Sequence, residues 1–262
     1  MDGACPQFTF EVYGARAQVR ASSAELLARL KASLPPVWTL CGFREGDPCF
    51  TITSTDDSAY LATLEGNEIA TGPLDLVINA LDSVIRLHIA YRAPEKIFIH
   101  AGVVGWGESA ILIPGVTMSG KTTLVGALVR AGASYLSDEY AVLDSDARVH
   151  PYAKPLSIRG KGRAQIDRDV AELGGQTAES PLPIGLIVVS EYQPDTRWDP
   201  RHISPAETML ELMRHTVPTR PAEMLAVLHR VVEGAIALEG PRGEADETAV
   251  QLLDTLARPA VA

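Results

Sequence analysis

The chain is poor in cysteine, poor in aromatic residues and has no excess of positive charge. Its three cysteines, Cys5, Cys41 and Cys49, are too few for a disulfide framework and lack the paired spacing of a metal site. We therefore expect a reduced, cytoplasmic setting. The formal net charge of −10 argues against nucleic acid as a partner, because neutralising its phosphates requires a basic surface.

Long apolar runs are also missing. Charged residues interrupt every apolar stretch well before the length that spans a bilayer, and the N-terminus has no basic segment followed by an apolar one. We expect no membrane segment, no membrane partner and no signal peptide. Hydrophobic residues nevertheless make up 46% of the 262 positions, which is enough for a sizeable core and excludes global disorder.

One motif dominates the sequence. An apolar β-type segment, Ile111–Ile113, leads into the pattern Gly-x-x-x-x-Gly-Lys-Thr, and a helical pattern follows. This is the order of a phosphate-binding loop, in which glycines turn backbone amides inward and the helix directs its positive end at a phosphate. The alternative is a chance glycine-rich turn. The expected nucleotide-binding residues are Gly115, Val116, Thr117, Met118, Ser119, Gly120, Lys121, Thr122 and Thr123.

Two side chains of this loop have distinct expected roles. Lys121 is a flexible point charge that reaches the β- and γ-phosphates of a nucleoside triphosphate such as ATP. The hydroxyl of Thr122 is a ligand for Mg²⁺. We therefore expect ATP and Mg²⁺ as cofactors.

The chain is predicted to form two domains, 1–94 and 95–262. In the first, Ser22 and Glu25 have the spacing of a capping box at the start of a helix, and a long amphipathic helix opens at Pro73. Short strands are expected at Phe8–Val12, Ala17–Val19, Cys49–Thr53 and Tyr60–Leu64. We expect a small α+β domain here that serves in substrate recognition.

The second domain is predicted to be α/β with a mixed sheet. Buried strands are expected at Ile97–Ile99, Ile111–Ile113, Ser134–Leu136 and Ile184–Val189. Gly102, Gly105 and Gly107 suggest a tight hairpin between the first two strands. Residues 160–182 are interpreted as a mobile loop without a strand. Further expected elements are a hairpin at Tyr140–Leu143 and Arg148–Val149, helices over 121–131, 220–234 and 245–257, a helix starting at Ser204–Glu207, and a strand at Ala235–Leu238.

An acidic pair, Asp138-Glu139, follows the strand after the loop's own helix. A strand beside Ile111–Ile113 would end near the loop and bring Asp138 to the γ-phosphate. One carboxylate could then accept a proton from an attacking hydroxyl, and the other could hold Mg²⁺. We expect Thr122, Asp138 and Glu139 to be the metal ligands. The alternative is an acidic pair in a solvated turn.

Several segments in order resemble the HPr kinase/phosphorylase family, which is related in fold to phosphoenolpyruvate carboxykinases. They are Phe98-Ile-His100-Ala-Gly102, the Gly-x-x-x-x-Gly-Lys-Thr loop, Tyr-Leu-Ser-Asp138-Glu139 and Leu-Ser-Ile-Arg159-Gly160. The likeness is good over 96–162 and only in outline over 183–240. His150–Ser157 resembles a short variant branch found beside peptide-modification genes.

The resemblance implies a catalytic set of Asp138, Lys121, His100 and Arg159. Asp138 would be the base for a serine hydroxyl, with Glu139 beside the metal. His100 would lie near the phosphates, and Arg159 would contact phosphate or stabilise charge in the transition state. Ser157 departs from the family's pattern, because a glutamate is expected there, so kinase activity is favoured over the reverse reaction. The relatives also suggest a homo-oligomer.

These observations lead to three hypotheses. The first is a kinase that transfers the γ-phosphate of ATP to a serine of a protein or peptide, such as a ribosomally made lasso peptide precursor. The second is a kinase for a small-molecule hydroxyl. The third is a regulatory module that binds ATP without turnover, and Ser157 is its best support.

Overall fold

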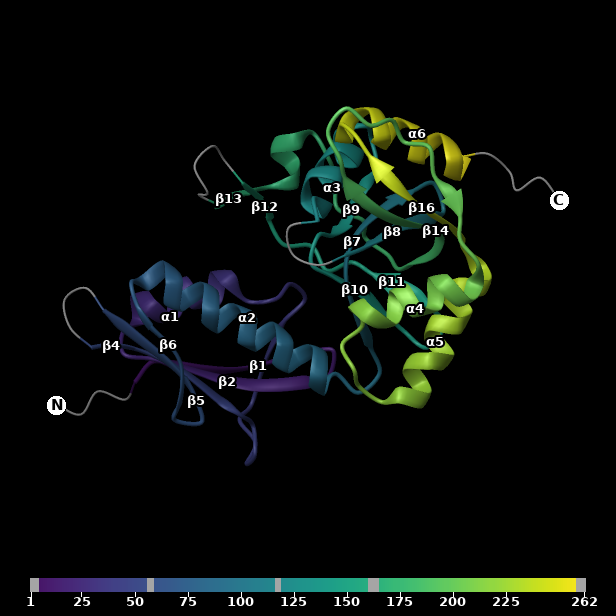
Figure 1. Cartoon of the computed structure of the whole chain (residues 1–262). Coiled ribbons are helices and arrows are strands. Elements are labelled where there is room, and N and C mark those ends of the chain that lie inside the picture. The colour runs from purple at the N-terminus through teal and green to yellow at the C-terminus, as the bar shows by residue number, and fades with distance from the viewer. Residues whose placement is uncertain (1–4, 56–58, 116–118, 160–164, 258–262) are drawn as a thin grey trace. The chain divides into compact units, whose positions relative to one another are not determined.

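The computed structural model describes residues 5–55, 59–115, 119–159 and 165–257, with only the backbone described at 157–159 and 165–167. The chain divides into two compact units, Met1–Glu95 and Lys96–Ala262. Each unit combines a mixed sheet with helices (Figure 1). The α/β class expected from the sequence is therefore confirmed. None of the helices in these described ranges is long and apolar enough to span a membrane.

The first unit is a six-stranded sheet with two helices packed on it. The strand order is β3-β1-β2-β4-β5-β6, in which only β2 and β4 pair in parallel. Helix α2 packs on β2, β5 and β6, and α1 packs on β2 and α2. The bounds are β1 Gln7–Val12, β2 Ala15–Ala21, α1 Ala24–Ser33, β3 Thr39–Cys41, β4 Cys49–Ser54, β5 Tyr60–Leu64, β6 Asn67–Gly72 and α2 Leu74–Arg92.

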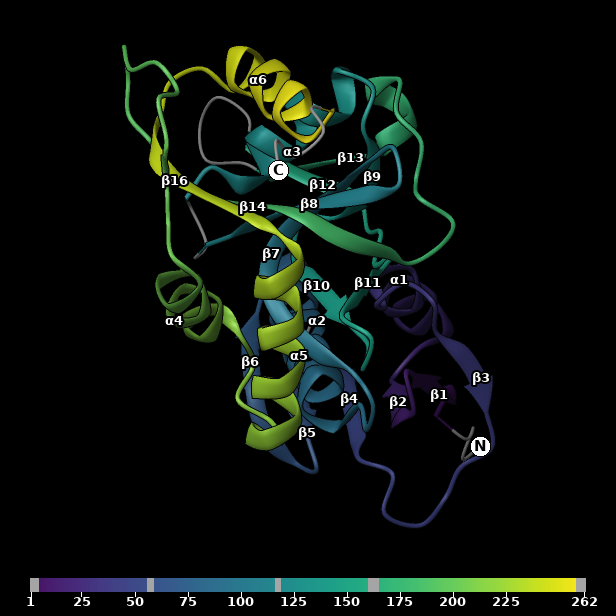
Figure 2. The same ribbon diagram turned by 90° about the vertical axis from the view of Figure 1, so that its right-hand side faces the viewer.

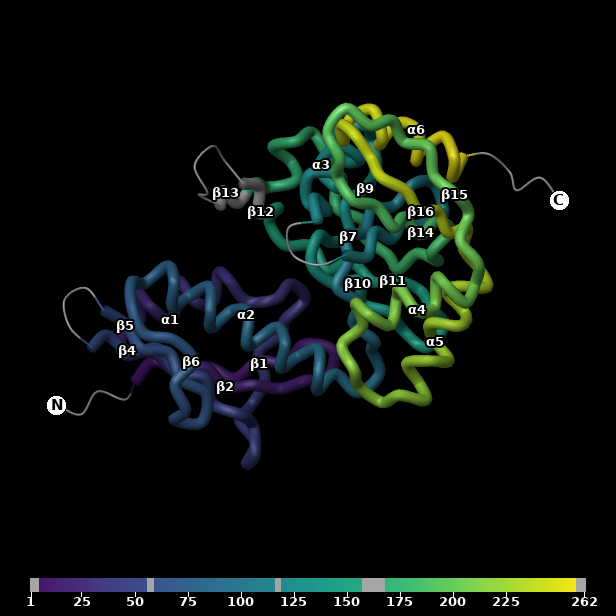
Figure 3. The backbone as a smooth tube through the Cα atoms, in the orientation of Figure 1, coloured from purple at the N-terminus to yellow at the C-terminus, as the bar shows by residue number. Residues whose placement is uncertain are grey.

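The second unit is built on a larger mixed sheet. Its strand order is β11-β10-β7-β8-β14-β16-β15, and β9 also pairs with β7. Strands β8, β14 and β16 run parallel and lie side by side (Figure 3). The strands are β7 Ile97–Trp106, β8 Ser109–Pro114, β9 Ser134–Ser137, β10 Tyr140–Leu143, β11 Arg148–His150, β14 Leu182–Tyr192, β15 Arg201–His202 and β16 Ile236–Arg242.

Four α-helices cover the two faces of this sheet. Helices α3 (Lys121–Arg130) and α6 (Ala245–Ala257) pack on one face, and α4 (Pro205–His215) and α5 (Pro221–Gly234) on the other (Figure 2). A separate pair of strands, β12 (Leu156–Arg159) and β13 (Gln165–Arg168), lies outside the main sheet, followed by a 3₁₀ turn at Val170–Leu173.

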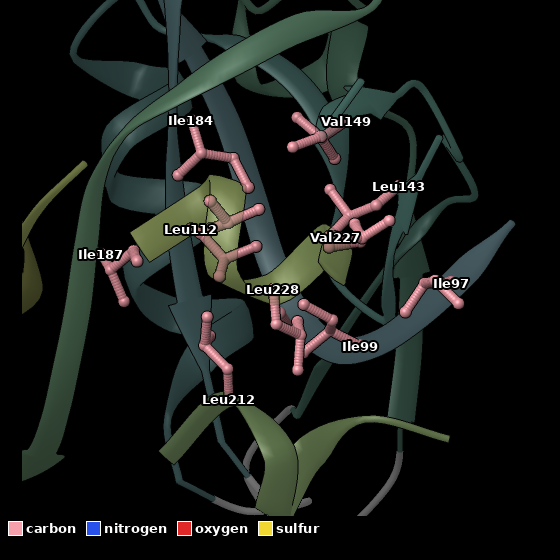
Figure 4. Packing of buried hydrophobic residues seen from close by; sticks show 14 of the residues in the cluster. Ile97, Ile99, Leu112, Leu143, Val149, Ile184, Ile187, Leu212, Val227 and Leu228 are labelled. Atoms are coloured by element: carbon pink, nitrogen blue, oxygen red, sulfur yellow. The ribbon is translucent and has the colours of Figure 1, made fainter. Parts of the chain in front are cut away.

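Alternation along β8 explains why the centre of the sheet is buried on both faces. Leu112 packs with Val227 and Leu228 of α5 (Figure 4), whereas Ile111 and Ile113 pack with the α3 and α6 side. Successive side chains of a strand point to opposite faces, so an unbroken apolar run satisfies both layers. This rigid centre carries the loop that follows β8.

Two expectations about local structure were wrong in detail, although the expected hairpin between β7 and β8 is present. Strand β7 continues to Trp106, so Gly102 and Gly105 lie within a strand and only Gly107 lies in the hairpin turn. The glycine at 102 is needed for packing, because an added Cβ would lie 2.6 Å from Cγ2 of Val125 on α3. The N-cap of α1 is Ser23, whose hydroxyl accepts a hydrogen bond from the amide of Leu26, not Ser22.

The prediction of a strandless loop over 160–182 also fails where the structure describes it. Residues Gln165–Arg168 form β13, and the following 3₁₀ turn is capped by Asp169. This segment is rich in charged residues and glycine, and both strands of the hairpin, β12 and β13, are short. Its sequence therefore shows no clear strand pattern. Residues 160–164 lie outside the described residues.

Candidate phosphate-binding and catalytic site

The phosphate-binding motif lies where β8 meets α3. Pro114 ends the strand, Lys121 begins the helix, and Gly120 is the N-cap with a φ of +84°. The carboxyl ends of the parallel strands β8, β14 and β16 meet at this edge of the sheet. Ligands of open α/β sheets bind at such edges. The helix N-terminus adds a positive partial charge there.

Two features of the loop match a phosphate cradle. A Cβ added to Gly115 would lie 2.8 Å from Oγ of Ser119, so the hydroxyl of Ser119 can keep this position only beside glycine. The Oγ of Ser119 is itself buried and has no hydrogen-bond partner in the described part of the chain. A buried hydroxyl without a partner is costly and is readily completed by a ligand oxygen. Val116, Thr117 and Met118 lie outside the described residues.

Lys121 points back into the loop. Its side chain is only 7% exposed, and its ammonium group donates a 2.7 Å hydrogen bond to the carbonyl of Gly115. Burial lowers the pKa of Lys121 to about 8, although the nearby carboxylate of Asp138 acts in the opposite direction. Burial removes the water that stabilises the ammonium charge of Lys121. An anionic ligand beside the ammonium group would stabilise that charge instead.

Asp138 is brought to the loop by an arrangement that differs from the expected one. Strand β9 pairs with β7 rather than beside β8, because the next neighbour of β8 is β14. Asp138 nevertheless reaches α3, and Thr122 Oγ1 lies 3.3 Å from Asp138 Oδ2. Asp138 is 7% exposed, and burial raises the pKa of its carboxyl, with a further increase from the charge of Glu139.

Tyr135 was not expected from the sequence to be part of this site. Its hydroxyl lies 3.1 Å from Oδ1 of Asp138 and 3.0 Å from the carbonyl oxygen of Lys154. The ring is fully buried, so the hydroxyl is held in place and fixes the orientation of the Asp138 carboxyl. The sequence signal for Tyr135 is the alternation of side chains along β9. This alternation places Tyr135 on the same side of the strand as Ser137, the residue before Asp138.

Glu139 points to a different partner from Asp138. Its Oε2 lies 2.7 Å from the ammonium group of Lys154, and both side chains are partly buried. This ion pair anchors the chain after β11 to the acidic pair. A metal-ligand role for Glu139 requires this pair to open.

His100 lies in β7 opposite Tyr140, and its ring meets that of Tyr140 edge-on at 6.0 Å between centroids. Its backbone carbonyl accepts a hydrogen bond from the amide of Gly115. Burial, together with the charge of Lys121, lowers the pKa of His100 to about 4. The imidazole beside the loop is therefore neutral at pH 7.

The remaining expected residues are placed less closely. Thr123 is exposed in the first turn of α3. Arg159 ends β12, and its side chain lies outside the described residues, as does that of Ser157. The structure therefore brings together Gly115, Ser119, Gly120, Lys121, Thr122, Asp138 and His100.

The residues present fit Mg²⁺ and a nucleoside triphosphate. Thr122 and Asp138 offer a hydroxyl and a carboxylate oxygen side by side. Magnesium keeps several waters and needs only one or two protein ligands beside the substrate phosphates. Consistent with this open type of site, the described residues contain no group of three or more His, Cys, Asp or Glu side chains that could hold a metal alone.

A cavity of about 900 Å³ opens beside the loop. Its walls come from Gly115 and Ser119, from the ends of β14 and β16, and from α4. Its charged lining is mostly acidic, namely Glu191, Asp199, Glu211 and Glu239 with Arg201 and His215. The volume lies in the range of small-molecule sites.

Comparison with solved structures gives distant likenesses. An HPr(Ser) kinase/phosphatase from Coxiella burnetii is similar in structure, with 18% identity and a TM-score of 0.35, over 60% of this chain and 96% of that chain. No protein-family model matches the chain. No curated protein matches it in sequence. The function proposed below therefore rests on this chain's own residues.

Proposed function

We propose that the second unit is an ATP- and Mg²⁺-dependent kinase that phosphorylates a serine-type hydroxyl of a protein or peptide. The observation that carries the proposal is the contact between Thr122 and Asp138 beside the buried ammonium group of Lys121. This contact puts a magnesium-type hydroxyl, a proton acceptor and a phosphate-binding cation within one small volume. Phosphoryl transfer needs these three functions and little else from a protein.

In this mechanism, Lys121 exchanges its hydrogen bond to the Gly115 carbonyl for one to the β- and γ-phosphates. The amides of the loop and the hydroxyl of Ser119 hold the remaining phosphate oxygens. Thr122 would hold Mg²⁺, which would supply neutralisation of the phosphate charge. Asp138 orients the acceptor hydroxyl and accepts its proton as the oxygen attacks the γ-phosphorus, and the bond from that phosphorus to the bridging oxygen breaks so that ADP leaves.

The environment of Asp138 suits a general base. Burial raises the pKa of its carboxyl, and a base whose pKa lies nearer the working pH accepts a proton more readily. Tyr135 keeps the carboxyl oriented through the 3.1 Å contact to Oδ1. The other carboxyl oxygen faces Thr122. The acceptor hydroxyl therefore approaches from the Thr122 side.

A second candidate acceptor is a small molecule with a hydroxyl group. The open cavity of about 900 Å³ beside the loop supports it, because this volume lies in the range of small-molecule sites. The two candidates share the same chemistry at Asp138 and differ only in what occupies the cavity.

The test is phosphoryl transfer from γ-labelled ATP with Mg²⁺. The acceptors are peptides encoded next to the gene, offered in parallel with a set of hydroxyl metabolites monitored by ADP release. We expect transfer to a serine peptide by the wild-type protein, a large loss in Asp138→Asn, and no ATP binding in Lys121→Met. Tight ATP binding without transfer to either kind of acceptor would support a regulatory ATP-binding module, and absence of ATP binding would contradict the phosphate-loop interpretation.

A further inference from the structure

A buried arginine lies against the phosphate loop. Arg242 ends β16, is 2% exposed, and was not singled out by any sequence pattern. Its Nη2 donates a 2.9 Å hydrogen bond to the carbonyl of Gly120, and its Nη1 donates a 3.1 Å bond to the carbonyl of Gly243. The ring of Tyr192 covers the guanidinium at 5.6 Å, and the Tyr192 hydroxyl donates to Glu244.

The charge of Arg242 is not balanced as the other well-buried arginines are. Nε of Arg86, which is 4% exposed, donates to Asp82 at 2.8 Å, and Arg16 pairs with Asp47 at 3.0 Å. Within the described ranges, Arg242 forms no ion pair, although the nearby charge of Glu244 opposes the lowering of its pKa by burial. Its Nε is buried and has no hydrogen-bond partner there. Burying a cation without an anion is costly, so an anionic ligand would restore the balance.

The position of this charge indicates the class of anion. Gly120 is the N-cap of α3, so Arg242 sits at the positive end of that helix, next to the buried ammonium of Lys121. Three positive groups therefore converge on one loop in a protein of net charge −10. Asp138 and Glu244 offset part of this charge, and a ligand with several negative charges, such as a polyphosphate, would balance it better than a single carboxylate.

We propose that Arg242 is a further phosphate-binding residue, whose guanidinium completes the charge balance of a nucleoside polyphosphate held in the Gly115–Thr122 loop. The inference rests on the proposed nucleotide site. Tyr192 and Glu244 keep the guanidinium against the loop. Nε is the buried guanidinium nitrogen that has no hydrogen-bond partner among the described residues, so a phosphate oxygen that reaches it would supply this bond while Nη2 keeps its bond to Gly120.

The first experiment compares variants by calorimetric titration with Mg·ATP. We expect Arg242→Gln to weaken ATP binding on the order of 10- to 100-fold, the range for a lost hydrogen bond to a charged group, and Arg242→Lys to retain part of the affinity. Arg130→Gln removes the same charge from the opposite end of α3, where Arg130 pairs with Asp246, and should bind as wild type. An ATP affinity for Arg242→Gln within about threefold of wild type would overturn the proposal.

The second experiment uses the wild-type protein and separates a phosphate contact from a brace for the loop. The Nε–H resonance of Arg242 is followed by NMR while Mg·ATP or inorganic pyrophosphate is added. We expect it to move downfield together with the amides of Ser119 and Gly120. Loop amides that shift while the Nε–H resonance stays still would overturn the role of Arg242 alone. If neither ligand moves any loop amide, the proposed nucleotide site is itself wrong.

Discussion

Thr122 Oγ1 lies 3.3 Å from Asp138 Oδ2, and this contact joins the first turn of α3 to the residue after β9. The two residues are separated by 16 positions, so one helix and one short strand suffice to bring them together. In the proposed function, this hydroxyl and carboxylate would hold the metal and accept the proton of the acceptor. The predictions below concern the groups around this pair.

Lys121→Met should abolish measurable ATP binding while leaving the fold intact. The ammonium group supplies a charge-assisted contact to phosphate that methionine cannot make. Calorimetric titration with Mg·ATP measures the loss. Lys31→Met removes an exposed charge from the first unit and should bind ATP as wild type; equal affinities in all three proteins would contradict the assignment of Lys121.

The buried ammonium also predicts how stability depends on pH. The pKa of Lys121 is about 8 in the folded protein and 10.5 in the unfolded chain, so the unfolded state holds the proton more tightly. The contribution of Lys121 to the free energy of unfolding therefore rises as pH increases from about 8 to 10.5. Unliganded Lys121→Met should be more stable than wild type at pH 7, by about 3 kcal/mol at most, and this advantage should fade by pH 10.5 in urea titrations.

Asp138→Asn should slow phosphoryl transfer by about 10²- to 10⁴-fold, the usual contribution of a general base. ATP affinity should change little, because the amide keeps the shape of the side chain. Burial raises the pKa of Asp138, and the base works only when deprotonated, so kcat/KM should fall on acidification at a pH above that of an ordinary aspartate. Asp146→Asn, in an exposed turn, is the matched control and should retain full activity.

His100 should contribute to acid lability rather than to phosphate binding as a cation. Its pKa is about 4 in the folded protein and 6.5 in the unfolded chain, so the unfolded state takes the proton first and stability falls between pH 6.5 and 4. His100→Gln should lose stability less steeply over this window in denaturant titrations. His202→Gln, at an exposed position of β15, should follow the wild-type slope.

Gly120→Ala should cost more than Gly107→Ala, although both glycines have positive φ, +84° and +60°. An added Cβ at Gly120 would lie 2.5 Å from Nη2 of Arg242, whereas the site around Gly107 is open. Gly107→Ala should lower the unfolding free energy by about 1 kcal/mol through backbone strain alone. Gly120→Ala should lose more than this and also lose ATP affinity. Equal losses in denaturant titrations would show that the contact with Arg242 is easily displaced.

The phosphate loop and its helix could be predicted because the pattern is local. The positions of the glycines, Lys121 and Thr122 follow from the strand, turn and helix that surround them. The assignment of Asp138 to the site also came from the sequence, although the expected strand neighbour was wrong. The order of strands in a mixed sheet depends on pairings far apart in sequence, such as β8 with β14, which a local pattern does not contain.

Arg242 and Tyr135 could not be found in this way. Strands β8, β14 and β16 are neighbours that run parallel, so their carboxyl ends lie at the same edge of the sheet. This arrangement brings Arg242, at the end of β16, to Gly120. Tyr135 reads as an ordinary strand residue, and its hydroxyl becomes informative only once Asp138 and Lys154 lie beside it. Roles of this kind depend on tertiary packing and cannot be inferred from residue type alone.

The distance along the chain between Gly120 and Arg242 has a consequence for biosynthesis. The guanidinium that contacts the loop lies 122 residues after it, and β14 must be inserted between the two strands first. A nascent chain therefore emerges from the ribosome with its phosphate loop present but its surrounding sheet incomplete. The hydrogen bond between Arg242 and Gly120 therefore cannot form until nearly all of the chain has been translated.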